Sequence, residues 1–254
     1  MQNFQVLLLA MVMLFVGCQN EKPGQRPPNI VYILADDLGI GDLSCYNFDS
    51  KIKTTHLDRL AEEGLRFTDA HSGSAVCTPT RYGILTGRYA WRTHLQNGVL
   101  WSYSEPLIPS EQSTVASLLK EANYRTACIG KWHLGLDWVR DSSDQVDFFA
   151  PIAGGPNANG FDYFFGITAS LDIPPYFYIR DDRITATSVD TIEAMEGKKF
   201  WREGPIGDDF VHEEVLPRLT AEAVSYIQAQ QDHDEPFFLY FPLPAPHTPI
   251  LPTE

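Results

Sequence analysis

Uninterrupted apolar runs mark the strands that this chain is expected to form. Residues 29–35 are mostly β-branched or apolar and show no alternation, which is typical of a strand covered on both faces. We expect this run to form a central parallel strand. Residues 124–129 and 236–241 have the same character and predict further buried strands.

Elsewhere the apolar residues recur at helical spacing. The pattern predicts a short helix over residues 57–63, ended by Gly64, and longer helices over residues 113–122 and 219–230. The residues expected on the apolar faces of the longer helices are Val115, Leu118, Leu119, Ala122, Ala223, Val224 and Ile227. Helices that alternate with strands predict an α/β fold, with a mostly parallel, mixed central sheet flanked by helices on both faces.

Several segments lack any sustained period. Residues 141–160 and 173–207 are rich in Gly, Pro, Asp and aromatic residues, and we expect long loops or small insertions there. Aromatic residues within 174–178 could stack on a ligand ring or belong to the hydrophobic core. The proline-rich segment 242–249 cannot form a helix and is expected to be an extended loop.

The N-terminus has the character of an export signal. The apolar run 6–17 is too short to span a bilayer comfortably but suits the core of a signal peptide. Residues 14–18 resemble a bacterial lipobox, which predicts a lipid anchor on Cys18, although an ordinary secretory signal is the alternative. We therefore expect a signal peptide over 1–18, a polar tether over 19–28 and a domain over 29–254, in a periplasmic or cell-surface lipoprotein.

Composition narrows the possible partners. The chain has 254 residues, 44% of them hydrophobic, and can bury a substantial core. Its net charge of −14 argues against nucleic-acid binding, which needs a basic face. The same charge repels an anionic substrate at long range, so a site for one needs its own local cations.

The segment Cys77-Thr78-Pro79-Thr80-Arg81 combines a nucleophile with a helix start. Thr78 is a plausible N-cap, with Pro79 in the first helical position, so Cys77 is expected just outside the helix N-terminus. Free N–H groups and the helix dipole favour an anion there, and Arg81 can add a bidentate contact. A small buried thiol is the alternative for Cys77.

Charged residues follow the predicted strands. Asp36 and Asp37 come directly after residues 29–35, and adjacent carboxylates there need a proton or a hard cation such as Ca²⁺, unless they form an exposed turn. Lys131 and His133 alternate after the strand 124–129, so both are expected to face one cleft while the intervening Trp132 packs the other way. Solvated surface positions are the alternative for both.

These motifs, with Leu85-Thr86-Gly87-Arg88 and the proline-flanked His247, together resemble the type I sulfatases of the alkaline-phosphatase-like superfamily, in the family's order from Asn29 onward. The resemblance implies that a formylglycine-generating maturation enzyme oxidises Cys77 to formylglycine, whose hydrated aldehyde is the nucleophile. It implies Ca²⁺ at Asp36, Asp37 and residue 77. The catalytic residues it implies besides residue 77 are Arg81, Lys131, His133 and His247, and the substrate-binding residues are Lys131, Ser170 and His247.

The sequence departs from the family in one respect. Family members extend further and supply an Asp-Asn metal pair, and no Asp-Asn dipeptide occurs here. Asp36, Asp37 and residue 77 supply too few ligands for Ca²⁺, so we expect the N-terminal portion of a sulfatase, with the C-terminal part missing. Hydrolysis of sulfate esters, on sulfated saccharides or small molecules, is the expected function. The alternatives are a phosphate or phosphonate monoester hydrolase and an inactive glycan-binding surface lipoprotein. Whether Cys45 and Cys128 pair stays open.

Overall fold

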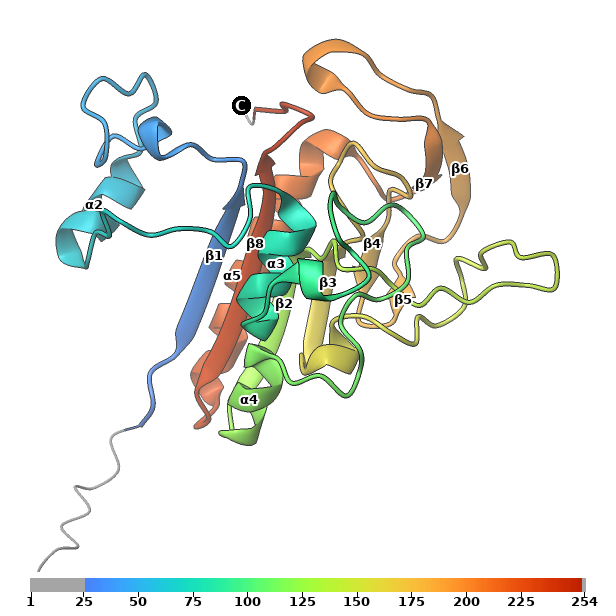
Figure 1. Cartoon of the computed structure of the whole chain (residues 1–254), viewed down its shortest axis with the longest axis horizontal. Helices are drawn as coiled ribbons and strands as arrows, with labels where there is room; N and C mark the ends of the chain where they lie inside the picture. The colour runs from blue at the N-terminus through green and yellow to red at the C-terminus, as the bar shows by residue number, and fades with distance from the viewer. Residues whose placement is uncertain (1–25, 253–254) are drawn as a thin grey trace, which may run out of the picture.

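The computed structural model describes residues 26–252 and forms a layered α/β fold (Figure 1). The main sheet has the strand order β1-β8-β2-β3-β4-β5. Its strands are β1 (Ile30–Asp36), β2 (Arg125–Lys131), β3 (Tyr163–Ile167), β4 (Tyr178–Arg180), β5 (Arg183–Ile184) and β8 (Phe237–Pro246). β1, β8, β2 and β3 run parallel, whereas β4 and β5 are antiparallel additions, so the expected mostly parallel, mixed sheet is confirmed.

Helices cover both faces of this sheet. The helices are α2 (Thr55–Glu63), α3 (Cys77–Thr86), α4 (Val115–Glu121) and α5 (Val215–Ala229). Short 3-10 turns occupy Ile40–Asp42, Ala90–Arg92, Asn157–Asn159, Gly197–Lys199, His212–Glu214 and Gln230–Asp232. Within the expected insertion 173–207, β6 (Val189–Ile192) and β7 (Gly204–Gly207) pair as a small separate sheet.

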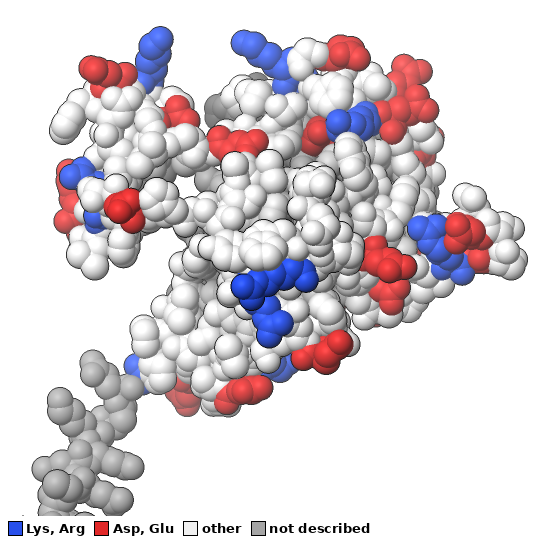
Figure 2. Space-filling view, viewed as in Figure 1, with Lys and Arg blue, Asp and Glu red and all other residues white. Residues whose placement is uncertain are grey.

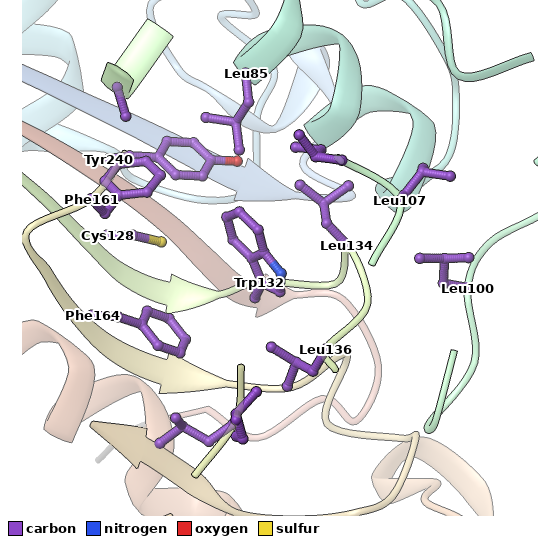
Figure 3. Close-up of a cluster of buried hydrophobic side chains, with 14 of the residues drawn as sticks. Leu85, Leu100, Leu107, Cys128, Trp132, Leu134, Leu136, Phe161, Phe164 and Tyr240 are labelled. Carbon is purple, nitrogen blue, oxygen red and sulfur yellow. The ribbon is translucent and has the colours of Figure 1, made fainter. Parts of the chain in front are cut away.

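Alternate residues of the central strands point to opposite faces of the sheet and belong to two hydrophobic clusters. Cys128 of β2 and Tyr240 of β8 face the layer that contains α3 and α4, together with Trp132 and Phe161 (Figure 3). On the opposite face, Ala127, Ile129, Phe237, Leu239 and Phe241 pack with residues of α5. The strands are thus buried on both sides, which explains their uninterrupted apolar runs.

The prediction that the first strand is central is wrong for the described part of the chain. β1 lies at the edge of the sheet, with β8 as its partner on one side. Val31, Tyr32 and Ile33 are between 41% and 58% exposed. The apolar run predicts what the strand can bury, but residues 26–252 provide no strand or helix that covers it fully.

The predicted apolar faces of two helices are buried only in part: Val115 and Leu119 pack against the core and Ala223 is buried, whereas the other predicted residues are exposed. In α4 the fully buried residue is Ala116, while Leu118 is largely exposed. α5 begins at Val215, with Pro217 tolerated in its first turn, and buries Val215, Leu219 and Ala223 rather than Val224. Single apolar residues on exposed helix faces are common, so spacing alone identified the packed faces only in part.

The proline-rich tail forms a strand instead of a loop. β8 continues through Pro242 and Pro244 to Pro246, and β1 pairs with it from Leu34 opposite Pro242 to Asp36 opposite Pro246, with an irregularity between. Proline fixes a φ that extended backbone can adopt and lacks only the N–H donor, so an acceptor-only position remains possible. The extension carries His247 to the end of the sheet.

The segment around α2 stands apart from the sheet, joined to it by the chain from β1 and the chain to α3 (Figure 1). Figure 2 shows charged side chains of both signs scattered over one face, with a hollow between the α2 segment and the main body. No helix within residues 26–252 is long and apolar enough to cross a membrane. The predicted signal peptide, Cys18 and most of the tether lie outside the described residues.

Candidate functional site

The polar residues predicted from the sequence gather where the parallel strands end. Asp36 is the last residue of β1 and Lys131 the last of β2, while His247 directly follows β8. Ser170 follows β3 after a short connection. Because these strands are parallel, their carboxyl ends share one edge of the sheet, which is where open α/β sheets bind ligands. The sheet therefore assembles a site from segments far apart in the sequence.

Cys77 begins α3 rather than preceding it. The N-cap is Val76, with no side-chain cap, so the prediction of Thr78 as the cap is wrong. The Thr78 hydroxyl instead donates to the carbonyl of His133 (3.0 Å) and accepts from the N–H of Leu100 (3.2 Å). Thr78 thereby fastens the nucleophile-bearing helix to the loop after β2. Cys77 remains in the first turn, where unpaired N–H groups favour an anion.

A buried ion cluster lies behind Cys77. The Asp36 Oδ2 atom lies 3.2 Å from Arg81 Nη2 and also accepts from Lys131 Nζ. All three side chains are at most 5% exposed. Arg81 Nη1 in addition donates to the carbonyl of Lys131 at 2.8 Å. Since two cationic side chains surround a single carboxylate, this cluster favours a further negative charge nearby.

The pKa values follow from this arrangement. Burial alone would raise the pKa of Asp36, but the charges of Lys131 and Arg81 outweigh it and hold the pKa below its usual value. Burial, followed by the charge of Arg81, lowers the pKa of Lys131. The carboxylate is therefore held ionised.

His133 is placed as a neutral base. Burial, reinforced by the charge of Lys131, lowers the pKa of His133 to about 3. Its Nε2 donates to the carbonyl of Leu100 at 3.0 Å, so the lone pair of the neutral ring belongs to Nδ1. Nδ1 is buried and has no hydrogen-bond partner among the described residues. The φ angle of His133 is 55°, a left-handed conformation typical of strained functional positions.

His247 lies between two acidic residues. Its Nε2 is 3.7 Å from Asp37 Oδ2, and its Nδ1 is 4.0 Å from Asp172 Oδ1. Nδ1 donates to the carbonyl of Thr248 at 2.7 Å. Asp37 also has a left-handed φ of 62°. The ring is thus held with Nε2 toward the predicted metal-binding residues.

Two cavities meet at Cys77. One, of about 230 Å³, is lined by Asp36, Asp37, Cys77, Arg81 and neighbouring small residues. The other, of about 220 Å³, is lined by residues from several separate segments: Asp37, Val76, Cys77, Val99, Trp101, His133, Ser170, Asp172, Ile173, Arg202 and His247. Lys131 lines neither cavity, because its ammonium group pairs with Asp36 in the buried cluster, so the prediction that Lys131 and His133 face one cleft is wrong. Cys77 therefore has access to both the cationic cluster and the histidines.

The charged and aromatic residues of the second cavity that were not predicted from the sequence are Trp101, Asp172 and Arg202. Trp101, Asp172 and Arg202 come from segments without a repeating pattern or a recognisable motif. The aromatic segment 174–178, for which stacking on a ligand and a place in the core were both left open, belongs to the core, since Tyr176, Phe177 and Tyr178 are at most 2% exposed. The only signal in the sequence was the lack of a sustained period in segment 173–207, which contains Arg202.

The described residues offer the type of ligand atom that Ca²⁺ prefers, but too few of them. Asp36 and Asp37 offer hard carboxylate oxygens beside Cys77, as Ca²⁺ prefers. Within residues 26–252, however, no group of three or more His, Cys, Asp or Glu side chains is arranged to hold a metal. These residues thus supply part of a shell of six to eight oxygens.

The remaining cysteines do not form a disulfide. Among the described residues, Cys45, Cys77 and Cys128 are all free thiols. Burial strongly raises the pKa of Cys128, which makes this thiol unreactive. The open question of a Cys45–Cys128 pair is settled against pairing.

Fold and site together define an α/β protein with a cluster of charged and polar residues at the strand ends, beside the N-terminus of α3. The sulfatase family profile matches residues 28–254. The chain belongs to the sulfatase family, which confirms the resemblance seen in its motifs.

Individual relatives agree with this assignment. An N-acetylgalactosamine-6-O-sulfatase of Bacteroides thetaiotaomicron is 35% identical over 96% of this chain and 54% of its own length. Arylsulfatase G of Canis lupus familiaris is 33% identical, over 94% of this chain and 46% of its own length. The chain spans about half the length of the curated relatives it matches.

Solved structures share the fold. One, from work on glycosaminoglycan metabolism by Bacteroides thetaiotaomicron, has a TM-score of 0.77 at 34% identity, covering 90% of this chain and 53% of its own. Another, in complex with k-i-k-neocarrahexaose, has a TM-score of 0.62 at 25% identity, covering 89% of this chain and 46% of its own. The expected alkaline-phosphatase-like sulfatase fold is thereby confirmed.

Proposed function

We propose that the complete gene product hydrolyses sulfate esters of saccharides at the site around residue 77. The observation that carries this proposal is the position of Cys77, which begins α3 and lines both the cavity beside the cationic cluster and the cavity that contains His133 and His247. A sulfate ester bound there would meet helix N–H groups and the excess positive charge of Arg81 and Lys131.

The proposal includes two groups that the chain must acquire. Oxidised to formylglycine by a maturation enzyme and then hydrated, residue 77 would supply a diol, one hydroxyl for attack on sulfur and the other for expulsion of sulfate. Asp36 and Asp37 would hold Ca²⁺ through their carboxylate oxygens, and such an ion would add positive charge beside the sulfuryl oxygens.

The chain's own residues complete the chemistry. His133 Nδ1, neutral and without a hydrogen-bond partner within residues 26–252, would accept a proton from residue 77. His247 would donate a proton to the departing alcohol oxygen, and Ser170, buried in the same cavity, would hold a sulfate oxygen. In the net reaction the ester S–O bond breaks, water supplies the oxygen of the released sulfate, and the alcohol leaves with a proton.

The names of the relatives support a saccharide substrate. Two of them, from Bacteroides thetaiotaomicron and Mus musculus, are N-acetylgalactosamine 6-sulfatases, and one solved structure holds a neocarrahexaose. We extend this substrate class, a sulfated saccharide, to the present chain.

Location and anchoring rest on the sequence alone. The signal-like run 6–17 and the lipobox-like residues 14–18 support export to the periplasm or cell surface, with a lipid on Cys18. Export is compatible with a saccharide substrate outside the cytoplasm.

A comparison of esters tests the proposal. The complete gene product, made in cells that contain the maturation enzyme, is assayed with 4-nitrophenyl sulfate, 4-nitrophenyl phosphate and N-acetylgalactosamine 6-sulfate. We expect turnover of both sulfates, poor turnover of the phosphate and no turnover by Cys77→Ala. Preferred phosphate turnover would indicate the phosphoesterase alternative, and saccharide binding without turnover would indicate a glycan-binding protein.

A further inference from the structure

We propose that Trp101, Asp172 and Arg202 form the subsite that holds the alcohol portion of the substrate, and that this portion is a pyranose ring with a free hydroxyl or amide N–H next to the sulfate ester. The inference rests on the proposed function and adds to it the recognition of the ring. All three residues line the cavity that contains Cys77 and His247.

Trp101 gives this cavity an exposed aromatic face. Among the described residues that line it, Trp101 is the only Phe, Tyr or Trp, and its side chain is 56% exposed. The Arg202 guanidinium lies 5.2 Å from the centre of the Trp101 ring and 5.0 Å from that of Phe200. Cation–π contacts hold the indole in one orientation before a ligand arrives. Val99 and Ile173 add apolar surface, so the cavity suits the C–H face of a sugar.

Asp172 supplies the polar half of the subsite. Arg202 Nη1 donates to Asp172 Oδ2 at 2.6 Å and to the Asp172 carbonyl at 2.9 Å. The other carboxylate oxygen, Oδ1, is buried and has no hydrogen-bond partner among the described residues. The nearby His247 Nδ1, at 4.0 Å, directs its proton to the carbonyl of Thr248 instead.

An unpaired carboxylate oxygen at a residue only 9% exposed is costly, so it requires a donor. A carboxylate accepts hydrogen bonds and repels anions. The ring position that meets Asp172 therefore carries a hydroxyl or amide N–H, whereas a second sulfate there would be rejected. The subsite thus selects against saccharides that are sulfated at this neighbouring position.

Equilibrium binding to the complete gene product tests the subsite independently of turnover. The probes are N-acetylgalactosamine 6-sulfate and inorganic sulfate, measured by calorimetry in protein that carries Cys77→Ala, so that no ester is hydrolysed. This background is compared, with wild type at every other position, with Trp101→Ala, Asp172→Asn and the control Trp91→Ala. Trp91 is equally exposed but does not line the cavity. We expect Trp101→Ala and Asp172→Asn to weaken saccharide binding about tenfold each, the effect of losing one stacking or charged hydrogen-bond contact. Binding of inorganic sulfate should stay unchanged in both, and Trp91→Ala should resemble wild type.

A mono-O-methylated series of the saccharide then identifies the neighbouring hydroxyl. One methyl ether should bind wild type about tenfold more weakly than the parent sugar, while Asp172→Asn should discriminate much less between the two. Equal saccharide affinity in Trp101→Ala and wild type, or methyl-ether discrimination that survives Asp172→Asn, would overturn the subsite.

Kinetics separate this role from a positioning effect on His247. Loss of ring recognition should raise KM for the saccharide with little change in kcat, while a disturbed His247 would lower kcat and shift its pH profile. If wild type binds the saccharide but hydrolyses no sulfate ester, the proposed function fails while the subsite stands. If wild type does not bind the saccharide at all, the subsite is refuted as well.

Discussion

In the buried cluster of Asp36, Arg81 and Lys131 one carboxylate compensates two cations, so we expect the loss of the carboxylate to destabilise the protein more than the loss of one cation. Asp36→Asn removes the one carboxylate and leaves two buried cations, neither more than 1% exposed, without compensation. Breaking a buried ion pair from one side costs about 3 to 5 kcal/mol, because the remaining charge is desolvated. Lys131→Met instead keeps the Asp36–Arg81 pair and fills a similar volume, so we expect a change of less than about 1.5 kcal/mol.

The measurement is denaturant unfolding of the complete gene product and its variants in a chelator, so that metal binding does not contribute to the stability. The double variant Asp36→Asn with Lys131→Met should recover part of the loss, since it leaves one unpaired cation instead of two. Equal destabilisation by the two single variants, or an additive double variant, would refute the view that Asp36 balances both cations.

Three further predictions concern backbone, pH and metal. Gly130→Ala should lower the free energy of unfolding by about 3 kcal/mol or more, because φ is 137° and a Cβ would lie 2.1 Å from the Pro242 carbonyl oxygen. The control Gly73→Ala should change it little, since its Cβ would meet no atom closer than 3.8 Å. Equal effects of the two substitutions in denaturant titrations would contradict this prediction. Burial lowers the pKa of His212 to about 4, below its unfolded value of about 6.5, so the unfolded state binds the extra proton between these values. The stability contributed by His212 should therefore be full above about pH 6.5 and fall by up to roughly 3 kcal/mol toward pH 4. His212→Phe should reduce the pH dependence of the melts by this amount and leave the part that arises from His133, whose pKa burial lowers to about 3; an unchanged slope would show that His212 does not contribute. Chelation should abolish ester turnover, and added Ca²⁺ should restore it. Asp37→Asn should need at least about tenfold more Ca²⁺ for this recovery, while its melting temperature stays near that of wild type. Recovery of wild type and Asp37→Asn at the same Ca²⁺ concentration would exclude Asp37 as a ligand.

Sequence pattern predicted the parts of the fold that repeat locally. The apolar runs located β1, β2 and β8, and the charged residues that follow two of these runs in the sequence, Asp36 and Lys131, end β1 and β2 at one edge of the sheet. What failed depends on the surroundings of an element. The same Leu118 would be buried or exposed depending on which helix face meets the sheet, and spacing does not contain that information.

Some residues of the candidate site could likewise be predicted from local sequence, whereas others could not. Cys77 and His133 belong to short sequence motifs that can be recognised from neighbouring residues alone. Trp101 and Arg202, by contrast, are 101 residues apart in irregular segments, and only tertiary packing places the guanidinium 5.2 Å from the indole centre. Thr78 illustrates a competing partner, since its hydroxyl bonds the loop after β2 instead of capping its own helix.

The central claim is that residue 77 acts as an oxidised nucleophile. The direct measurement is the mass of the proteolytic peptide that contains residue 77, taken from an active preparation of the complete gene product, beside a Cys77→Ala preparation. We predict an aldehyde in place of the thiol, in a fraction of molecules that tracks the specific activity toward sulfate esters. Full activity in a preparation whose Cys77 is entirely unmodified thiol would contradict the account.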